Sequence, residues 1–534
     1  MNQYSLEKIL AQITKVTGIT PIFPPAEIHA DLALPCFKTD PESIKNILKK
    51  KKIKEIESLI ISGRYVNITF NPLLVAKNLF SDLKKSGKNF GARKKSNKKI
   101  FLEYSSPNIA KPLHIGHLRN TLLGRALHNL FLSQGYKVTT ENWLGDWGKQ
   151  YGLVILAYTL WGDDKAFAKS PTTHLFDLYV KINEAAKTDP TIHDKAREIF
   201  KKMEDGDKHY LALWKKFREA SIKDFKKSYK KLNIIFDFWH GESFYTPYME
   251  AVIKSLLKKK IASHTPNGPT VIDLTDFNLN SYLVKKADGA SLYSARDLAT
   301  QIYRYKKYKP EKIFIITAEE QGFYFKQLIK TLGLLGYPEN RFKNIVYGIV
   351  NLAGGKMSTR SGNIVGFDEL LDEAENRAGK TIGHGAVIYN LLSQTNEKTV
   401  NFDLDRALSL VGNSAPYIQY ASVRIQNILK KAKKPSPLKD WKNISLTQLE
   451  KDLSLLLSRY PLVVKQSTDD TSPHLLISYL QSLATVMSRY YTETSILKTP
   501  EKHLLAFRLK LLSAINHTLI SGLSLLGISV PKKM

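Results

Sequence analysis

The sequence has little of what several protein classes depend on. Cys36 is its only cysteine among 534 residues, which excludes a disulfide framework and a cysteine-based zinc site. No run reaches the roughly 18 apolar residues that a membrane-spanning helix needs. The N-terminal stretch MNQYSLEKILAQITK carries polar and acidic residues and lacks the apolar core of a signal peptide. We therefore expect a cytoplasmic protein that does not enter a membrane.

Acidic residues are also scarce relative to basic ones. The chain has 80 Lys and Arg against 49 Asp and Glu, a formal net charge of +31. A surplus of this size favours a polyanionic partner, because each phosphate that a basic side chain neutralises releases condensed counterions. A Lys-rich proteome is the alternative explanation. Hydrophobic residues make up 43% of the chain, enough to build folded cores.

The length predicts three or four domains. Residues 1–84 mix short helical and strand patterns, which predicts a small α+β domain. The basic stretch 85–99 contains two glycines and is interpreted as a linker. Residues 402–534 are helical in pattern and end in two long amphipathic segments, 475–491 and 504–527.

Between the linker and this helical region, apolar runs alternate with helical segments. The alternation predicts an α/β domain with a parallel sheet over residues 100–401. A Lys-rich, mainly helical stretch at about 163–270 is interpreted as an insertion between the two halves of that domain. The runs expected to form strands are KIFLEYS (99–105), YKVTTENW (136–143), TVIDLT (270–275), KIFIIT (312–317) and NIVYGIV (344–350).

The segment SSPNIAKPLHIGHLRN places His114 and His117 three residues apart, where a strand is expected to turn into a helix. Zinc binding would need a third ligand, which is missing nearby. A packing or capping role is a second interpretation. The third is phosphate binding, because a helix start with Gly116 presents backbone N–H groups and a positive dipole end to an anion.

A second segment, GGKMSTRSGN, follows an expected strand from Gly354 onward. Its glycines, Lys356 and Ser358 are typical of a loop that closes on a triphosphate. The GxxxxGK[ST] phosphate-binding loop does not occur in the chain. Taken alone, KMST is a weak motif.

Together, HIGH near the first strand and KMS after a late strand resemble the class I aminoacyl-tRNA synthetases. The flanking motifs SSPNIAKPLHIGHLRNT, ENWLGDWGKQYG, YSARD, AEEQGFYFKQL and YGIVNLAGGKMSTRSG resemble arginyl-tRNA synthetases, as do NSAPYIQYASVRIQNILKK and the ending LLGISVPKKM. GRYVNITF is similar to their additional tRNA-binding domain. The resemblance covers essentially the whole chain. It implies a Rossmann-like catalytic domain, a small N-terminal domain and an all-α anticodon-binding domain.

The resemblance implies an arginine–tRNA ligase that uses ATP with substrate-borne Mg²⁺ and no zinc or organic cofactor. ATP would be bound by the HIGH residues His114, Gly116 and His117 and by the loop residues Lys356, Met357 and Ser358. The general loop, KMSKS, has a second lysine at its fourth position, where this chain has Thr359, followed by Arg360. In such relatives a lysine before HIGH supplies the missing charge, and Lys111 occupies that place. The residues implied in catalysis are His114, His117, Lys111 and Lys356.

The implied arginine-binding residues lie around these motifs. Asp297 and Tyr293 would be nearest the guanidinium, with Asp146 as a further neighbour. The full set is Glu103, Asn108, Tyr293, Asp297 and Gln321. A capping role at a helix start is the alternative for Tyr293 and Asp297. The chain departs from the family pattern at Tyr324, often histidine, and at Ala415, commonly glycine.

The remaining implications concern tRNA(Arg). The C-terminal helices would hold the anticodon, with arginine activation requiring bound tRNA and the enzyme acting as a monomer. The implied anticodon contacts are Tyr417, Tyr420, Arg424, Tyr491 and Met534, with helix packing as the alternative for the tyrosines. Another class I synthetase, or a tRNA-binding relative without activity, is disfavoured because the expected ATP and arginine residues are all present.

Overall fold

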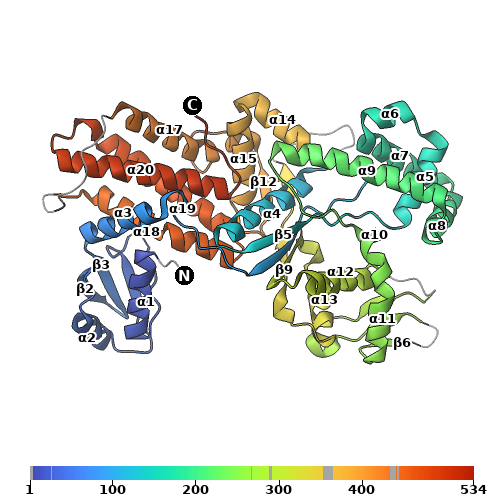
Figure 1. Cartoon of the computed structure of the whole chain (residues 1–534), viewed down its shortest axis with the longest axis horizontal. Helices are drawn as coiled ribbons and strands as arrows, with labels where there is room; N and C mark the ends of the chain where they lie inside the picture. Colours follow the sequence, from blue (N-terminus) through green and yellow to red (C-terminus); the bar gives the residue numbers. More distant parts are fainter. Residues whose placement is uncertain are drawn as a thin grey trace. The chain divides into compact units, whose positions relative to one another are not determined.

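The computed structural model describes residues 4–25, 27–265, 268–287, 292–352, 365–432, 441 and 444–534. Backbone contacts divide the chain into two compact units (Figure 1). The first consists of Met1–Lys95, Ser133–Gly135 and Asp405–Met534, and the second of Ser96–Leu132 and Tyr136–Leu404.

A four-stranded parallel sheet organises the second unit, with strand order β10-β9-β4-β5. The sheet confirms three of the expected strands. Those at 99–103 and 312–318 are largely buried, as strands covered on both faces are, whereas the edge strand at 137–141 is buried only at its last two residues. The bounds are β4 (Lys99–Glu103), β5 (Lys137–Glu141), β9 (Lys312–Ala318) and β10 (Phe342–Tyr347). Helix α4 (Ile115–Ser133) connects β4 to β5, and α13 (Gly322–Leu334) connects β9 to β10.

Two strand predictions were wrong in detail. Residues 270–275 contribute β7 (Thr270–Ile272) to an antiparallel sheet of order β6-β7-β8, outside the parallel sheet. Its connections are too short for the crossover that parallel pairing needs. The run 344–350 is broken after Tyr347, and β11 (Val350–Leu352) instead pairs with β12 (Val400–Phe402). Arg119 donates to the carbonyl oxygen of Gly348 at this break.

Helices fill the long interval between β5 and β9. The first part is α5 (Lys149–Trp161), α6 (Asp164–Lys169), α7 (Pro171–Thr188), α8 (Thr191–Glu204) and α9 (Lys208–Lys231). The second part contains α10 (Glu242–Tyr245), α11 (Met249–Lys258), β6 (Ala262–His264), β8 (Tyr282–Lys285) and α12 (Tyr293–Tyr308). Helices α14 (Phe367–Ala378) and α15 (Lys380–Leu392) follow β11.

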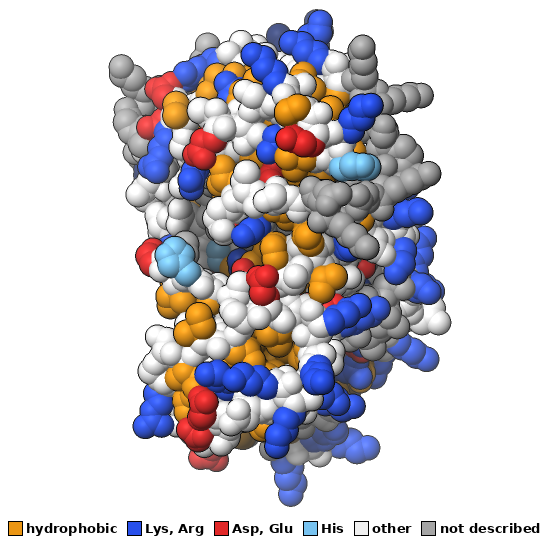
Figure 2. All heavy atoms as spheres, turned by 90° about the vertical axis from the view of Figure 1, so that its left-hand side faces the viewer, with side chains coloured by type: hydrophobic (Ala, Val, Ile, Leu, Met, Phe, Trp, Pro, Cys, Tyr) orange, Lys and Arg blue, Asp and Glu red, His pale blue; other side chains and the backbone are white. Residues whose placement is uncertain are grey.

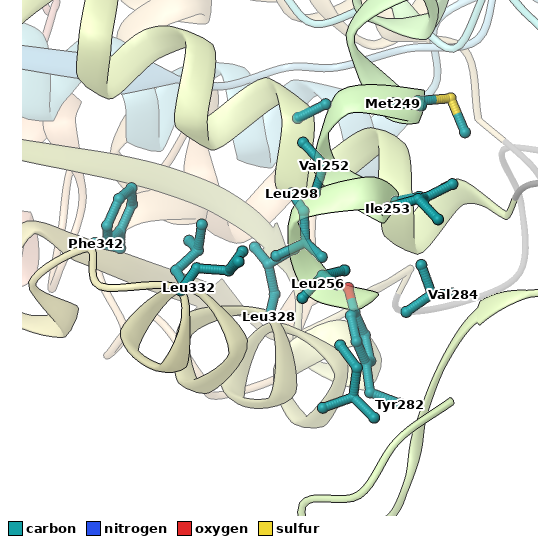
Figure 3. Close-up of a cluster of buried hydrophobic side chains, with 14 of the residues drawn as sticks. Met249, Val252, Ile253, Leu256, Tyr282, Val284, Leu298, Leu328, Leu332 and Phe342 are labelled. Atoms are coloured by element: carbon teal, nitrogen blue, oxygen red, sulfur yellow. The ribbon is translucent and has the colours of Figure 1, made fainter. Parts of the chain in front are cut away.

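One hydrophobic core joins α11, α12, α13 and the small antiparallel sheet. Figure 3 shows Val252 and Leu256 of α11, Leu298 of α12 and Leu328 of α13 converging in it. All four side chains are buried. The core therefore sets the position of α12 relative to the strands.

The first unit contains the expected small α+β region and a helical bundle. Its three strands, in the order β1-β3-β2, form an antiparallel sheet. The elements are α1 (Ser5–Thr17), β1 (Leu32–Pro35), α2 (Pro41–Lys51), β2 (Ile56–Ser62), β3 (Tyr65–Phe70) and α3 (Pro72–Ser86). In the stretch 85–99, Phe90 is buried and the guanidinium of Arg93 pairs with Glu7.

The C-terminal part of this unit is all helical, as predicted. Its main helices are α17 (Ala415–Lys431), α18 (Gln448–Asp469), α19 (Pro473–Glu493) and α20 (Lys502–Leu525). The last two confirm the amphipathic segments expected at 475–491 and 504–527. Glu450 is fully buried in this bundle, where it accepts hydrogen bonds from Tyr490 and Arg508 at 2.9 and 2.8 Å.

Basic side chains are spread over the face drawn in Figure 2, with acidic ones scattered among them. Within the part of the chain that the structure describes, no helix combines the length and the apolar character needed to cross a bilayer.

Close packing of α4 on the end of β4 gives a test of the fold. A Cβ atom on Gly124 would lie 2.1 Å from Cγ of the buried Tyr104. We expect Gly124→Ala to destabilise the unit by about 1–3 kcal/mol and to lower its unfolding temperature by several degrees. Differential scanning calorimetry measures this. In the control Gly333→Ala the nearest neighbour of the new Cβ is the flexible side chain of Glu339, so an equal loss there would contradict the packing argument.

Candidate active site

A cavity of about 1710 Å³ opens at the carboxyl ends of the parallel strands. Glu103, Ala318 and Tyr347, the last residues of β4, β9 and β10, all line it. Ligands of open parallel sheets bind at this edge, where the loops that follow the strands converge. The carboxylates in its lining are Glu103, Glu204, Glu242, Glu250, Asp297 and Glu320.

The segment between β4 and α4 has a strained backbone. Ser105, Ser106 and Ala110 all adopt positive φ angles, of 73°, 49° and 60°. Such conformations persist only where surrounding contacts fix them. The backbone N–H of Ser105 donates to Asn120 Oδ1 at 2.7 Å, and that of Ala110 donates to Ser221 Oγ at 3.0 Å. The held segment leaves Asn108 exposed in the cavity lining.

The two histidines of HIGH lie side by side at the start of α4, with ring centroids 3.9 Å apart. The N–H of Gly116 donates to His114 Nδ1 at 3.1 Å, and the N–H of His114 donates to His117 Nδ1 at 3.3 Å. Burial and the charge of Lys111 lower the pKa of His114, while burial, His114 and Lys111 lower the pKa of His117 to about 3. Both rings are therefore neutral at pH 7 with their proton on Nε2, which leaves two Nε2–H donors.

Backbone hydrogen bonds join the start of α4 to the residues that follow the KMST segment. The N–H of Ile115 donates to Val365 O, and that of Phe367 donates to Leu113 O, both at 3.0 Å. Lys356, Met357 and Ser358 lie outside the described residues, as do Thr359 and Arg360. The residues that follow the KMST segment are therefore hydrogen-bonded to the HIGH motif and to the residue before it.

Lys111 lies close to the histidines but does not line the cavity. Its Nζ is 4.6 Å from the ring centroid of Tyr179 on α7, in a cation–π contact. Its charge contributes to the lowered pKa of both His114 and His117. Of the HIGH residues, His117 lines the cavity.

Asp297 and Tyr293 extend from the first turns of α12 into the cavity lining, and Gln321 joins them from the end of β9. Tyr324 donates a hydrogen bond to Asp297 and accepts one from Tyr282 at 3.1 Å. Burial nevertheless raises the pKa of Asp297 to about 7. A carboxylate held in this way has a strong electrostatic preference for a cationic ligand.

Glu103 lines the cavity but already binds a cation of the protein. Arg304 of α12 is fully buried and donates to Glu103 and to Glu141 at the end of β5. Although burial opposes it, the charge of Arg304 and a hydrogen bond with His240 lower the pKa of Glu141. Glu103 is therefore part of a buried ion network as well as of the cavity wall.

Asp146 does not line the cavity, and its carboxylate is fully buried in contacts with the protein. It accepts from Arg218 Nε at 2.7 Å and from the N–H and hydroxyl of Ser243 at 2.8 and 2.9 Å. These contacts join the β5–α5 loop to α9 and α10, which is a structural role.

Sequence reasoning missed Glu242 and Arg296. Both line the cavity, and their side chains form an ion pair of 2.6 Å. Burial raises the pKa of Glu242 despite this partner. Arg296 could have been noticed beside Asp297 in YSARD, but no local pattern marks Glu242, which is far from Arg296 in the sequence.

The expected anticodon residues come together in part. The guanidinium of Arg424 on α17 lies 4.3 Å from the ring centroid of Tyr420 and 4.9 Å from that of Tyr491 on α19. Tyr491 is 40% exposed, as is Met534. The hydroxyl of Tyr417 instead contacts Ser488 Oγ at 3.1 Å. Arg424 and the two rings form a partly exposed platform in the helical bundle.

Comparisons with known proteins agree with this geometry. Residues 79–425 match the class I tRNA synthetase (R) catalytic domain, and residues 418–534 match the DALR anticodon binding domain. The arginine–tRNA ligase of Clostridium botulinum is 35% identical over 96% of this chain and 95% of its own length. That of Lactococcus lactis is 36% identical over 99% of both chains. The arginyl-tRNA synthetase of Thermus thermophilus shares the fold, with a TM-score of 0.83 and 23% identity over 99% of both chains. The chain therefore belongs to the arginine–tRNA ligase family of class I aminoacyl-tRNA synthetases.

Proposed function

We propose that the chain joins L-arginine to tRNA(Arg) in two steps. A carboxylate oxygen of arginine attacks the α-phosphate of ATP, forming arginyl-adenylate as the bond to pyrophosphate breaks. The 2′-hydroxyl of the terminal tRNA adenosine then attacks the adenylate carbonyl, and AMP leaves. The observation that carries this proposal is a cavity at the strand ends that contains several carboxylates, among them Asp297, beside a pair of neutral histidines at a helix start.

The ATP end of the site would use His114, Gly116 and His117. The two Nε2–H groups and the N-terminus of α4 can donate to phosphate oxygens, and they gain strength as negative charge develops during the displacement. Lys356 and Ser358, with Met357 between them, would contact the triphosphate. Mg²⁺ would arrive with ATP as part of the substrate.

The arginine end would use Asp297 and Tyr293 for the guanidinium, with Glu242 as an additional carboxylate in the lining. Asn108, Gln321 and the wall residue Glu103 would orient the α-amino and carboxylate groups. Tyr324 keeps the Asp297 carboxylate hydrogen-bonded before the substrate arrives. Such preorganisation of both ends places the reacting carboxylate against the α-phosphate.

The tRNA would be held at several places. The Tyr420–Arg424–Tyr491 platform offers stacking surfaces for unpaired anticodon bases. Tyr417 and Met534 would be further anticodon contacts. The small N-terminal domain and the Lys-rich insertion would add contacts to the phosphate backbone. We further propose that arginine activation requires bound tRNA, and that the enzyme acts as a cytoplasmic monomer.

Arginine-dependent exchange of pyrophosphate into ATP tests the proposed reaction. We expect exchange in the presence of tRNA(Arg) and none in its absence. Citrulline, which has the length of arginine but a neutral end group, should not replace arginine, because the cavity carboxylates would lose their cationic partner. No exchange under either condition would contradict the ligase activity, while exchange without tRNA would contradict only the tRNA requirement.

Lys111→Ala tests the charge supplied before HIGH. We expect the turnover of the exchange reaction at saturating ATP to fall on the order of 100-fold, because a cation that stabilises developing phosphate charge is removed. Lys181→Ala is a matched control, since Lys181 makes a similar cation–π contact, 4.3 Å from the ring centroid of Trp161. An unchanged turnover in the Lys111 variant would make that lysine a surface residue without a catalytic role.

The raised pKa of Asp297, about 7 in the free protein, predicts a pH dependence. The guanidinium requires the carboxylate form, so the KM for arginine should rise by up to about tenfold per pH unit below pH 7, while the KM for ATP changes less.

Above pH 7 the buried carboxylate of Asp297 lowers the folding stability, because its pKa in the folded state exceeds that in the unfolded state. Asp297→Asn should therefore not lower the unfolding temperature at pH 8, although it weakens arginine binding. A large loss of stability at pH 8, or a KM for arginine independent of pH, would contradict this account.

A further inference from the structure

A groove separate from the active-site cavity lies between α11 and α12 and has a volume of about 460 Å³. Its floor is apolar: Val252 is buried where α11 packs on α12, in the core drawn in Figure 3, and Leu335 is buried at the end of α13. Its sides carry three tyrosines and three lysines. These tyrosines and lysines are Tyr248, Tyr303, Tyr337, Lys259, Lys306 and Lys307.

The aromatic side chains form a partly exposed surface. The ring centroids of Tyr248 and Tyr303 lie 5.0 Å apart, and Phe244 lies 5.4 Å from Tyr303 behind them. Tyr248 is 42% exposed, so a large apolar area remains open to a ligand. Flat rings of this kind are stacking surfaces for unpaired bases, which contribute through their π-faces whatever their identity.

The charge in the groove is of one sign. Lys259, Lys306 and Lys307 are exposed, and among the described residues no carboxylate lines the groove. Lys259 Nζ donates to the carbonyl oxygen of Leu335 at 2.6 Å, which fixes this ammonium group at the wall. More lysines flank the groove along α11 and just after it, at positions 254, 258 and 260. Lys254 has a counterion in Glu250, 3.7 Å away, but the lysines of the groove lining repel one another, and a bound polyanion relieves that repulsion.

We propose that this groove binds unpaired nucleotides of the tRNA, with one base stacked on Tyr248 and Tyr303 and phosphates bound by Lys306 and Lys307. The inference rests on tRNA being the substrate, as proposed above. It adds a contact distinct from both the adenylate site and the anticodon platform. The same helix thus serves two ligands, because Tyr293 and Asp297 line the catalytic cavity while Tyr303 and Lys306 line the groove.

Binding of a fluorescein-labelled hexacytidylate and of its abasic counterpart to the full chain tests the proposal. Tyr248→Ala should weaken hexacytidylate binding at least fivefold and leave abasic binding unchanged, because only stacking is removed. Lys306→Gln combined with Lys307→Gln should weaken both, and should reduce the slope of log affinity against log salt by about 1.4. An excess of tRNA(Arg) transcript should displace the hexamer.

The control combines Lys165→Gln with Lys169→Gln on α6, where both lysines are exposed and outside the groove. It should leave the preference for hexacytidylate over the abasic strand intact. Equal binding of both strands by the unmodified chain, retention of the preference in Tyr248→Ala, or failure of tRNA to displace the hexamer would each overturn the proposal. Because binding is measured without ATP and arginine, its failure is distinguishable from a failure of the ligase reaction.

Discussion

The active site depends on a guanidinium buried inside the protein. Arg304 on α12 has no exposed surface, and it joins Glu103 at the end of β4 to Glu141 at the end of the neighbouring β5. Burying a charge costs much free energy unless it is paired, and here two carboxylates share one cation. The network therefore fixes the rotation of α12 against the sheet. That rotation places Tyr293, Arg296 and Asp297, about two to three turns earlier on the same helix, in the lining of the cavity.

Ion pairs of this kind explain how several carboxylates can lie close together in and behind the wall of the cavity. Glu103 and Glu141 are compensated by Arg304, and Glu242 is compensated by Arg296 at 2.6 Å. Among the described residues, the hydroxyl of Tyr324 is the direct partner of Asp297, and burial raises the pKa of this carboxyl group to about 7. Asp297 is thus a pocket carboxylate without an ion pair to a described cation of the protein. A ligand guanidinium would supply that cation, so the site would exchange some folding stability for selectivity toward a positively charged substrate.

Much of the architecture could be predicted from the sequence because its signals are local. Apolar runs marked β4, β5 and β9, and the HIGH and KMST segments are long enough to be recognised without any contact information. The strand predictions that were wrong concern features decided by contacts between residues distant in the sequence. The run 270–275 has the composition of a strand, but short connections pair it antiparallel with β6 and β8. The run 344–350 is interrupted where Arg119 binds the carbonyl of Gly348, a contact across more than 200 positions. Glu242 and Arg304 were missed for the same reason, since their partners lie on other elements.

The distribution of charge along α12 bears on the large basic surplus of the chain. Its N-terminal half presents Arg296 and Asp297 to a cavity whose lining mixes carboxylates with basic residues, whereas its C-terminal half presents Lys306 and Lys307 to a groove in whose described lining no carboxylate occurs. Carboxylates are therefore present where a cationic amino acid would be selected, and lysines are the charged groups of the groove, where an RNA would be held. A net charge of +31 exceeds what one specific contact requires. It is consistent with an RNA held over several surfaces, each contributing phosphate contacts whose strength falls with salt, while the neutral histidines and the pocket carboxylates would carry the chemical selectivity.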